Sequence, residues 1–237
     1  MAGRERAIWS VLQDGDSTVV VSFEPRIDPH ISALCVAIAN VVRAARLTGV
    51  RDVVEGYATV TVHFDPMQAT IEAVTAAVRE FAENTPVLLR DEQPINRETC
   101  LPVCYGGQHG PDLADVAAFG QCTEADVIRR HTERTYRVYM LGFLPGFAYL
   151  GTVDARIAAP RRHTPRVRVL AGSVGIAGLQ TGVYPTESPG GWQIIGRCPV
   201  RLCDWAGEPP LLLRSGDCVR FEPIDGLTYE RLAVGRG

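Results

Sequence analysis

The stretch LAGSVGIAGLQTGVYPTESPGGWQIIG, residues 170–196, decides how the second half of this chain folds. It holds seven glycines, and its short apolar runs alternate with turn signals at Gly182, Tyr184-Pro185 and Ser188-Pro-Gly-Gly191. Glycines spaced in this way are typical of bulges and tight corners between short strands. The stretch therefore predicts a mostly antiparallel β-barrel or sandwich.

The segments on either side extend the same β-rich texture. Strands are predicted at Glu98–Cys104, Tyr136–Leu141 and within Leu211–Pro223. Between the first two, Thr123-x-x-Asp126 resembles a capping box and predicts a helix through about His131. We therefore expect a β-rich domain over about residues 93–237.

The first part of the chain shows a different pattern, a strand followed by a helix, twice. Thr18–Phe23 and Ala58–Phe64 alternate as strands, and Asp28-Pro29 and Asp65-Pro66 each supply a capping residue and a proline for a helix start. Further strands near residues 50–55 and 87–89 would complete a small ferredoxin-like α+β sandwich. We expect this domain over residues 1–92, and thus an α+β protein of two domains.

The composition excludes several classes of protein. Apolar residues make up 46% of the 237 residues and charged residues 22%, so the chain as a whole is not disordered. A formal charge of −3 disfavours a nucleic-acid or anionic-membrane protein. All 24 basic residues are arginine, so the chain cannot carry a Walker-A loop, a Schiff-base lysine or a biotinylated lysine.

Targeting, membrane and metal signals are weak. Met1–Ser10 lacks the apolar core of a signal peptide, and Ile31–Ala45 is too polar for a membrane span. The seven cysteines are scattered without the spacing of zinc ligands. We expect a cytoplasmic protein that binds neither membrane nor nucleic acid and has no metal site.

Several candidate sites allow two interpretations. The spacing Gly172-x-x-Gly175-x-x-Gly178 suits strand corners or a ligand groove lined by backbone. Ala171–Gly175 resembles a nucleophile elbow, although a β-like stretch follows it where that motif needs a helix. The apolar loop Gly142–Gly151 suits core packing or an aromatic pocket wall.

Two titratable residues are equally open. His131 is expected at a helix end, where a cationic or hydrogen-bonded role competes with proton transfer. Asp112 fits the N-cap of a short helix through Phe119, and it is also a candidate for proton transfer. Five arginines bracket the glycine-rich stretch, and convergence of two would make an anion site; they are Arg161, Arg162, Arg166, Arg168 and Arg197.

A longer series of motifs resembles one family. It comprises Tyr105–Leu113, His131-Thr132, Tyr136–Gly151, Thr164-Pro-Arg166, Ala171–Pro185 and Ser188–Arg197. Together these segments resemble the allophanate hydrolase subunit 1 family, also called the carboxyltransferase C/D or 5-oxoprolinase B-subunit family. The resemblance is dense over about residues 100–223. It implies that the β-rich domain is a cyclophilin-like barrel.

The resemblance implies an ATP-dependent cyclic amide hydrolase that converts 5-oxo-L-proline to L-glutamate. This chain would be inactive alone, and would work with two other 5-oxoprolinase subunits, the homologous C subunit of carboxyltransferase type and a third one, the A subunit. ATP, with Mg²⁺, is the implied cofactor. The alternatives within the family are an inhibitor of a sensor histidine kinase and part of a carboxyltransferase for urea or allophanate.

We expect an anionic ligand in the groove of the barrel, because glycines let it meet the backbone while a few polar groups fix it. The expected ligand-binding residues are Arg166, Ser173, Gln180, Tyr184, Ser188, Trp192 and Arg197. No catalytic residue is assigned, and Asp112 and His131 are the candidates for proton transfer. The apolar loop and the barrel edge are expected to contact the homologous C subunit.

Overall fold

The computed structural model describes residues 8–91 and 97–234. It divides the chain into two compact units, Met1–Ile95 and Asn96–Gly237. Each unit has its own hydrophobic core. We describe each by itself.

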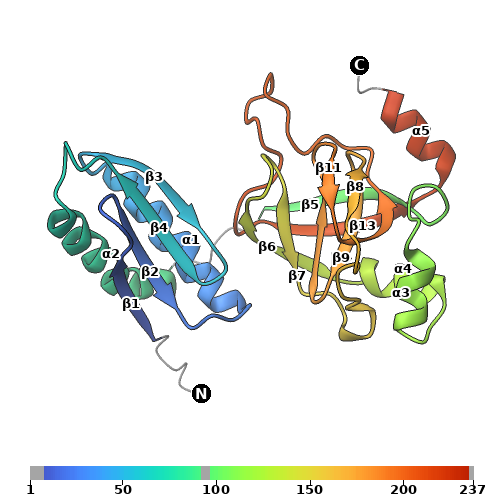
Figure 1. Cartoon of the computed structure of the whole chain (residues 1–237), viewed down its shortest axis with the longest axis horizontal. Helices are drawn as coiled ribbons and strands as arrows, with labels where there is room; N and C mark the ends of the chain where they lie inside the picture. Colours follow the sequence, from blue (N-terminus) through green and yellow to red (C-terminus); the bar gives the residue numbers. More distant parts are fainter. Residues whose placement is uncertain (1–7, 92–96, 235–237) are drawn as a thin grey trace. The chain divides into compact units, whose positions relative to one another are not determined.

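The N-terminal unit is a four-stranded antiparallel sheet with two helices (Figure 1). Its elements are β1 (Trp9–Gln13), β2 (Thr18–Phe23), α1 (Pro29–Ala45), β3 (Val50–Glu55), β4 (Thr59–Phe64) and α2 (Ile71–Asp91). The strands lie in the order β1-β2-β4-β3. Strand residues such as Val21 and Val62 pack against helix residues such as Ile38 and Val78, which buries one face of the sheet.

The two helix starts differ in how well the sequence predicted them. Asp28 caps α1 as expected, because its carboxylate accepts the backbone N–H groups of His30 and Ile31 at 2.8 and 3.1 Å. The start of α2 at Asp65-Pro66 was wrong. Asp65 instead closes a turn by accepting the N–H of Met67, and α2 begins six residues later, at Ile71.

The expected strand at residues 87–89 is also wrong, because α2 continues through Asp91. A short apolar run has no period that separates a helix from a strand, which explains the error. The sheet takes its fourth strand from the other end of the unit instead. There β1 pairs antiparallel with β2, from Trp9 opposite Phe23 to Gln13 opposite Val19.

The second unit is a closed β-barrel with short helices at its ends (Figure 1). The barrel strands are β5 (Glu98–Tyr105), β6 (Thr135–Leu141), β7 (Ala148–Gly151), β9 (Ser173–Ala177), β10 (Gln180–Val183), β12 (Gln193–Arg197) and β13 (Cys218–Ile224). They close in the order β10-β7-β6-β13-β5-β12-β9. All barrel pairs are antiparallel except β13 with β5, which is parallel and was not expected.

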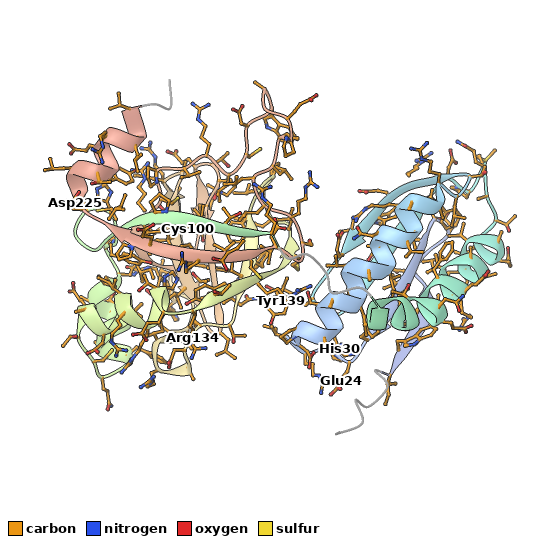
Figure 2. All side chains as sticks on the ribbon, turned by 180° about the vertical axis from the view of Figure 1, so that it is seen from behind. Glu24, His30, Cys100, Arg134, Tyr139 and Asp225 are labelled. Atoms are coloured by element: carbon orange, nitrogen blue, oxygen red, sulfur yellow. The ribbon has the colours of Figure 1, made fainter. Side chains whose placement is uncertain are left out.

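The remaining elements cover the barrel. They are α3 (Leu113–Phe119), α4 (Glu124–Thr132), a 3-10 turn at Ala155–Ile157, the paired strands β8 (Arg166–Val169) and β11 (Ser188–Gly190), and α5 (Gly226–Val234). The barrel interior is filled by aliphatic and aromatic side chains, among them Leu101, Val174, Ile195 and Phe221. Figure 2 shows Asp225, where β13 gives way to α5, and Cys100 on β5, which lies beside β13.

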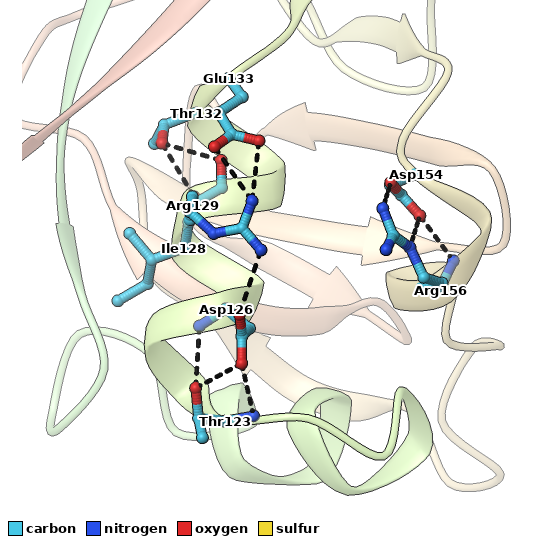
Figure 3. A network of polar contacts seen from close by, with 8 residues as sticks. All are labelled: Thr123, Asp126, Ile128, Arg129, Thr132, Glu133, Asp154 and Arg156. Carbon is cyan, nitrogen blue, oxygen red and sulfur yellow. Dashed lines mark hydrogen bonds and ion pairs between the residues drawn. The ribbon is translucent and has the colours of Figure 1, made fainter.

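The capping box predicted at Thr123 and Asp126 is confirmed (Figure 3). The Thr123 hydroxyl accepts the Asp126 N–H at 3.1 Å, and the Asp126 carboxylate accepts the Thr123 N–H at 3.3 Å. Arg129 then bridges Asp126 and Glu133 along the exposed side of α4. The capping box and these ion pairs stabilise α4, whose last turn carries His131.

Among the described residues, no helix is long and apolar enough to cross a membrane. In the same ranges, no three His, Cys, Asp or Glu side chains gather closely enough to hold a metal ion.

Candidate functional site

Asp112 is the centre of the site, and the backbone fixes its position. It follows the glycine-rich turn Gly106–Gly110 and stands at the N-cap position of α3. Its N–H donates to the Ile194 carbonyl at 2.9 Å, and its Oδ2 accepts the Ile194 N–H at 2.6 Å. Only 1% of the residue is exposed. Asp112 is therefore held against β12, a barrel strand.

Two arginines converge on this buried carboxylate. Arg166, at the start of β8, donates from Nη1 to Oδ2 at 2.8 Å and from Nη2 to Oδ1 at 2.6 Å. Arg162 donates from Nη1 to Oδ1 at 2.7 Å. We call Asp112, Arg162 and Arg166 the Asp112 cluster. Two guanidinium groups on one carboxylate make a positively charged feature at the barrel surface.

The hydrogen bonds decide what Asp112 does. Oδ1 accepts from both arginines, and Oδ2 accepts from Arg166 and from the Ile194 N–H, so each oxygen has two donors. Such a carboxylate has no acceptor position left for a substrate proton. Asp112 occupies the expected N-cap position but makes no side-chain cap bond. The geometry favours a positioning role, in which Asp112 orients the two arginines.

An aromatic group lies next to the cluster. Phe147, Tyr184 and Trp192 are nearly completely buried and pack edge to face, with ring centroids 5.3 and 5.4 Å from Phe147. Burial raises the pKa of Tyr184, while a hydrogen bond from the Trp192 backbone and the charges of Arg161 and Arg166 act to lower it. The Tyr184 hydroxyl lies against Gly190, which pairs with Arg166 in the β8–β11 ladder.

The structure brings together only part of the expected ligand site. Arg166, Tyr184 and Trp192 lie in one neighbourhood, beside the Asp112 cluster. Arg197 takes a different partner, donating from Nε to the Ala171 carbonyl at 2.9 Å.

The other three expected residues lie on strands. Ser173 stands opposite Arg197 in the β9–β12 ladder, and Ser188 is buried on β11 opposite Val169. Gln180 begins β10 opposite Gly151 and Ala177. Ser173 begins a strand and is followed by no helix, so it does not sit on a nucleophile elbow.

His131 lies inside the barrel, fully buried, with both ring nitrogens hydrogen-bonded. Thr181 Oγ1 donates to the Gly175 carbonyl at 2.9 Å, so it accepts the proton of His131 Nε2, 2.9 Å away. Nδ1 then accepts the Tyr105 hydroxyl at 2.8 Å. Burial lowers the pKa of His131 to about 3. This neutral imidazole links α4, β5 and β10 and has no open nitrogen for a substrate.

Acid should destabilise the barrel through His131. The pKa of this group is depressed in the folded state, so below its ordinary value of about 6.5 the unfolded chain takes up the proton and the folded one does not. Stability is therefore lost as pH falls from about 6.5 toward about 3. We expect His131→Gln to have a lower free energy of unfolding than the parent at pH 7. The difference between the two proteins should narrow by about 2 kcal/mol when the pH is lowered to 5, because the parent alone loses the contribution of the buried neutral histidine.

Urea unfolding of both proteins at the two pH values measures this gap. His63→Gln is the matched control, because it removes a histidine that is exposed on β4. A constant gap for His131→Gln would show that this histidine is not buried as a neutral group.

Arg162 was not among the ligand-binding residues predicted from the sequence. The sequence did point to Arg162 as a candidate for an anion site, since it is one of the arginines that bracket the glycine-rich stretch. Its partner Asp112 lies 50 residues earlier, and only the closed barrel brings the two together. The ion pair has no local spacing by which it could have been found.

Comparison with known proteins shows which family and which proteins the chain resembles. The model of the carboxyltransferase domain, subdomain C and D, matches residues 9–213. The 5-oxoprolinase B subunit of Bacillus subtilis is 39% identical over 93% of this chain and 95% of its own length. The protein of the same name from Escherichia coli O157:H7 is 40% identical over 88% and 93%. These matches confirm the family resemblance.

Solved structures show the same fold within longer chains. One, TTHA0988, is 33% identical with a TM-score of 0.78 and covers 88% of this chain, which spans only 40% of it. Urea amidolyase of K. lactis shares the fold at 18% identity and a TM-score of 0.77, and this chain spans 16% of it. The fold therefore also occurs as one part of larger proteins.

Proposed function

The chain belongs to the carboxyltransferase subdomain C and D family, and from this premise we propose that it is a subunit of an ATP-dependent 5-oxoprolinase. One observation carries the proposal. Two relatives named as the B subunit of 5-oxoprolinase match this chain at 39 and 40% identity along nearly their whole lengths. The reaction would open the ring of 5-oxo-L-proline to give L-glutamate.

The Asp112 cluster supports the proposal through its chemistry. 5-Oxoproline is a cyclic amide that carries one carboxylate, and paired guanidinium groups bind carboxylates. Asp112 holds Arg162 and Arg166 in fixed positions, so little side-chain entropy is lost when an anion binds. In this proposal the chain binds and orients the substrate.

The described residues do not fit Mg–ATP at the Asp112 cluster. A magnesium ion prefers carboxylate and water ligands, but both oxygens of Asp112 are fully used by donors. The glycine-rich stretch forms the β9–β10 hairpin, with Gly178 at φ +58°, and no helix follows it to face a phosphate. We therefore assign ATP to a partner protein, and propose that this chain is inactive alone.

We propose two partners, the homologous C subunit and the A subunit of the same enzyme. In the apolar loop, Phe147 is 1% exposed and belongs to the aromatic group, whereas Phe143 is 59% exposed. Phe143 also has φ +70°, which is unusual for a bulky residue. We propose that it contacts the homologous C subunit.

All seven cysteines are free, which supports the proposed cytoplasmic location.

Reconstitution tests this function. The chain is purified with its two proposed partners and supplied with ATP, Mg²⁺ and 5-oxo-L-proline, and glutamate and ADP are measured. We expect both products in equal amounts from the three proteins together, and no glutamate when this chain is omitted. A complete complex that releases no glutamate contradicts the proposal. In a separate assay, transfer of the carboxyl group from an added carboxylated biotin carrier to urea would support a carboxyltransferase instead.

A further inference from the structure

The two edges of the N-terminal sheet differ in how they are protected. Its strands lie in the order β1-β2-β4-β3, so β1 and β3 are the edge strands (Figure 1). An edge strand offers unpaired N–H and C=O groups to other chains, and natural proteins protect it with charged residues, prolines or bulges. Strand β3 carries Arg51, Asp52 and Glu55, and its ladder with β4 shifts register between Val50 and Asp52. The β3 edge is therefore protected.

The edge strand β1 has none of these features. Its residues, from Trp9 to Gln13, are uncharged and include no proline. Its ladder with β2 is regular, from Trp9 opposite Phe23 to Gln13 opposite Val19. Among the described residues of the N-terminal unit, no strand pairs with the other side of β1. This side is open to a further strand.

Apolar side chains on both faces of β1 are incompletely covered. Leu12 lies on the face of the sheet opposite the helices and is 54% exposed, and Ile8, the residue before the strand, is 86% exposed. Trp9 and Val11 point to the helix side, where they pack against the core but are only half-buried. A strand added beside β1 would therefore remove apolar surface from water on both faces.

The charges on either side of β1 in the sequence favour a second copy of the same strand. Arg4, Glu5 and Arg6 precede the strand and are net basic, whereas Asp14 and Asp16 follow it. Two antiparallel copies bring the basic end of each sequence to the acidic end of the other. Two parallel copies would bring like charges together, which is destabilising. Antiparallel self-pairing is therefore electrostatically complementary.

The alternation of side chains sets the register of such a pair. Residues directly opposite each other in an antiparallel pair point to the same face, so Trp9 and Val11 must meet residues of the helix side. One register that meets this condition places Ser10 opposite Ser10 of the second copy. It sets apolar residues against one another, with Trp9 opposite Val11 and Ile8 opposite Leu12.

We propose that the chain forms a dimer in which β1 pairs antiparallel with β1 of a second copy, about a two-fold axis at Ser10. The sheets of the two copies then become one continuous sheet. Association stops at two copies, because the opposite edge of each sheet, β3, is protected. This inference does not depend on the proposed function.

Sedimentation equilibrium of the full chain tests the dimer. We expect twice the mass of one chain at about 100 µM, with the mass falling toward that of one chain on dilution, as a dissociation constant in the micromolar range requires. A mass that stays at one chain at the higher concentration would overturn the inference. So would a mass that grows beyond two chains.

Charged variants at Ser10 test the register, because Ser10 is exposed and lies on the proposed axis. In Ser10→Lys, and likewise in Ser10→Glu, two like charges face each other across the axis. Each variant alone should dimerise at least about tenfold more weakly than the parent. An equimolar mixture of the two should regain the dimer, since the introduced charges are then opposite in sign.

Val54→Lys is the matched control, because it adds a charge at an exposed position of the other edge strand, β3. It should leave dimerisation unchanged, and melting temperatures confirm that all three variants fold. Parent-like dimerisation of Ser10→Lys, or a mixture that associates no better than either variant alone, would each overturn the inference.

Discussion

Asp112→Asn should destabilise the barrel by about 3 kcal/mol or more, the largest effect that we expect from one polar substitution. The change removes the negative charge that separates Arg162 and Arg166 and places an amide N–H₂ among their donors. The arginines are 31 and 27% exposed on their side chains, so water relieves part of the repulsion. The expected loss is therefore near the lower end of the range for a broken buried ion pair.

Urea unfolding at pH 7 measures this loss. Asp115→Asn is the matched control, because it removes the same charge from the same helix at a position that is largely exposed. We expect it to change stability by less than about 0.5 kcal/mol. If Asp112→Asn were as stable as the parent, Asp112 would not be the residue that holds the arginines.

Gly110→Ala should cost about 3 kcal/mol or prevent folding. A Cβ at Gly110 would overlap the Ile195 carbonyl oxygen and lie 2.6 Å from the Gly106 N, both backbone atoms that cannot rotate away. Relief requires the turn before Asp112 to move off β12, which would also displace the carboxylate. Overpacking against a fixed backbone is at the severe end of such substitutions.

The control for this steric effect is Gly226→Ala, since nothing lies within 4 Å of a Cβ there. Melting temperatures of the two variants are compared with the parent. We expect a large drop for Gly110→Ala and almost none for Gly226→Ala. Equal melting temperatures would show that the turn Gly106–Gly110 does not need the close approach to β12.

The sequence predicted those features that rest on local chemistry. Asp28 caps α1 and Thr123 caps α4, because a capping side chain needs only the next three residues. The short strands around the glycine-rich stretch were predicted by the same logic, and the barrel that they form is closed. Asp65 misled the prediction because the same side chain also closes a turn.

The pairing of strands that are far apart in the chain could not be predicted from the sequence. The strand β1 was missed because its side chains are half-buried or exposed, and only its ladder with β2 defines it. The parallel pairing of β13 with β5 joins residues about 120 apart, from Cys218 opposite Glu98 onward.

The candidate site likewise has a part that the sequence predicted and a part that it could not predict. Arg166 was predicted because arginines cluster in the sequence, but their shared partner Asp112 is 50 or more residues away. His131 was left open between two roles, and only its burial against Thr181 and Tyr105 favours the structural one. Side chains that meet across the barrel are far apart in the sequence, so the spacing of neighbouring residues does not predict their contact.

Substrate binding by this barrel is tested by the KM for 5-oxo-L-proline of the reconstituted enzyme of three proteins, with Arg166→Ala in this chain. Arg166 makes the bidentate ion pair at the centre of the proposed substrate site. We expect KM to rise at least about tenfold, because the site loses one of its two positive charges and Asp112 loses its bidentate partner, while Arg168→Ala leaves KM unchanged. An enzyme with Arg166→Ala and the KM of the parent would contradict the claim that this barrel binds the substrate.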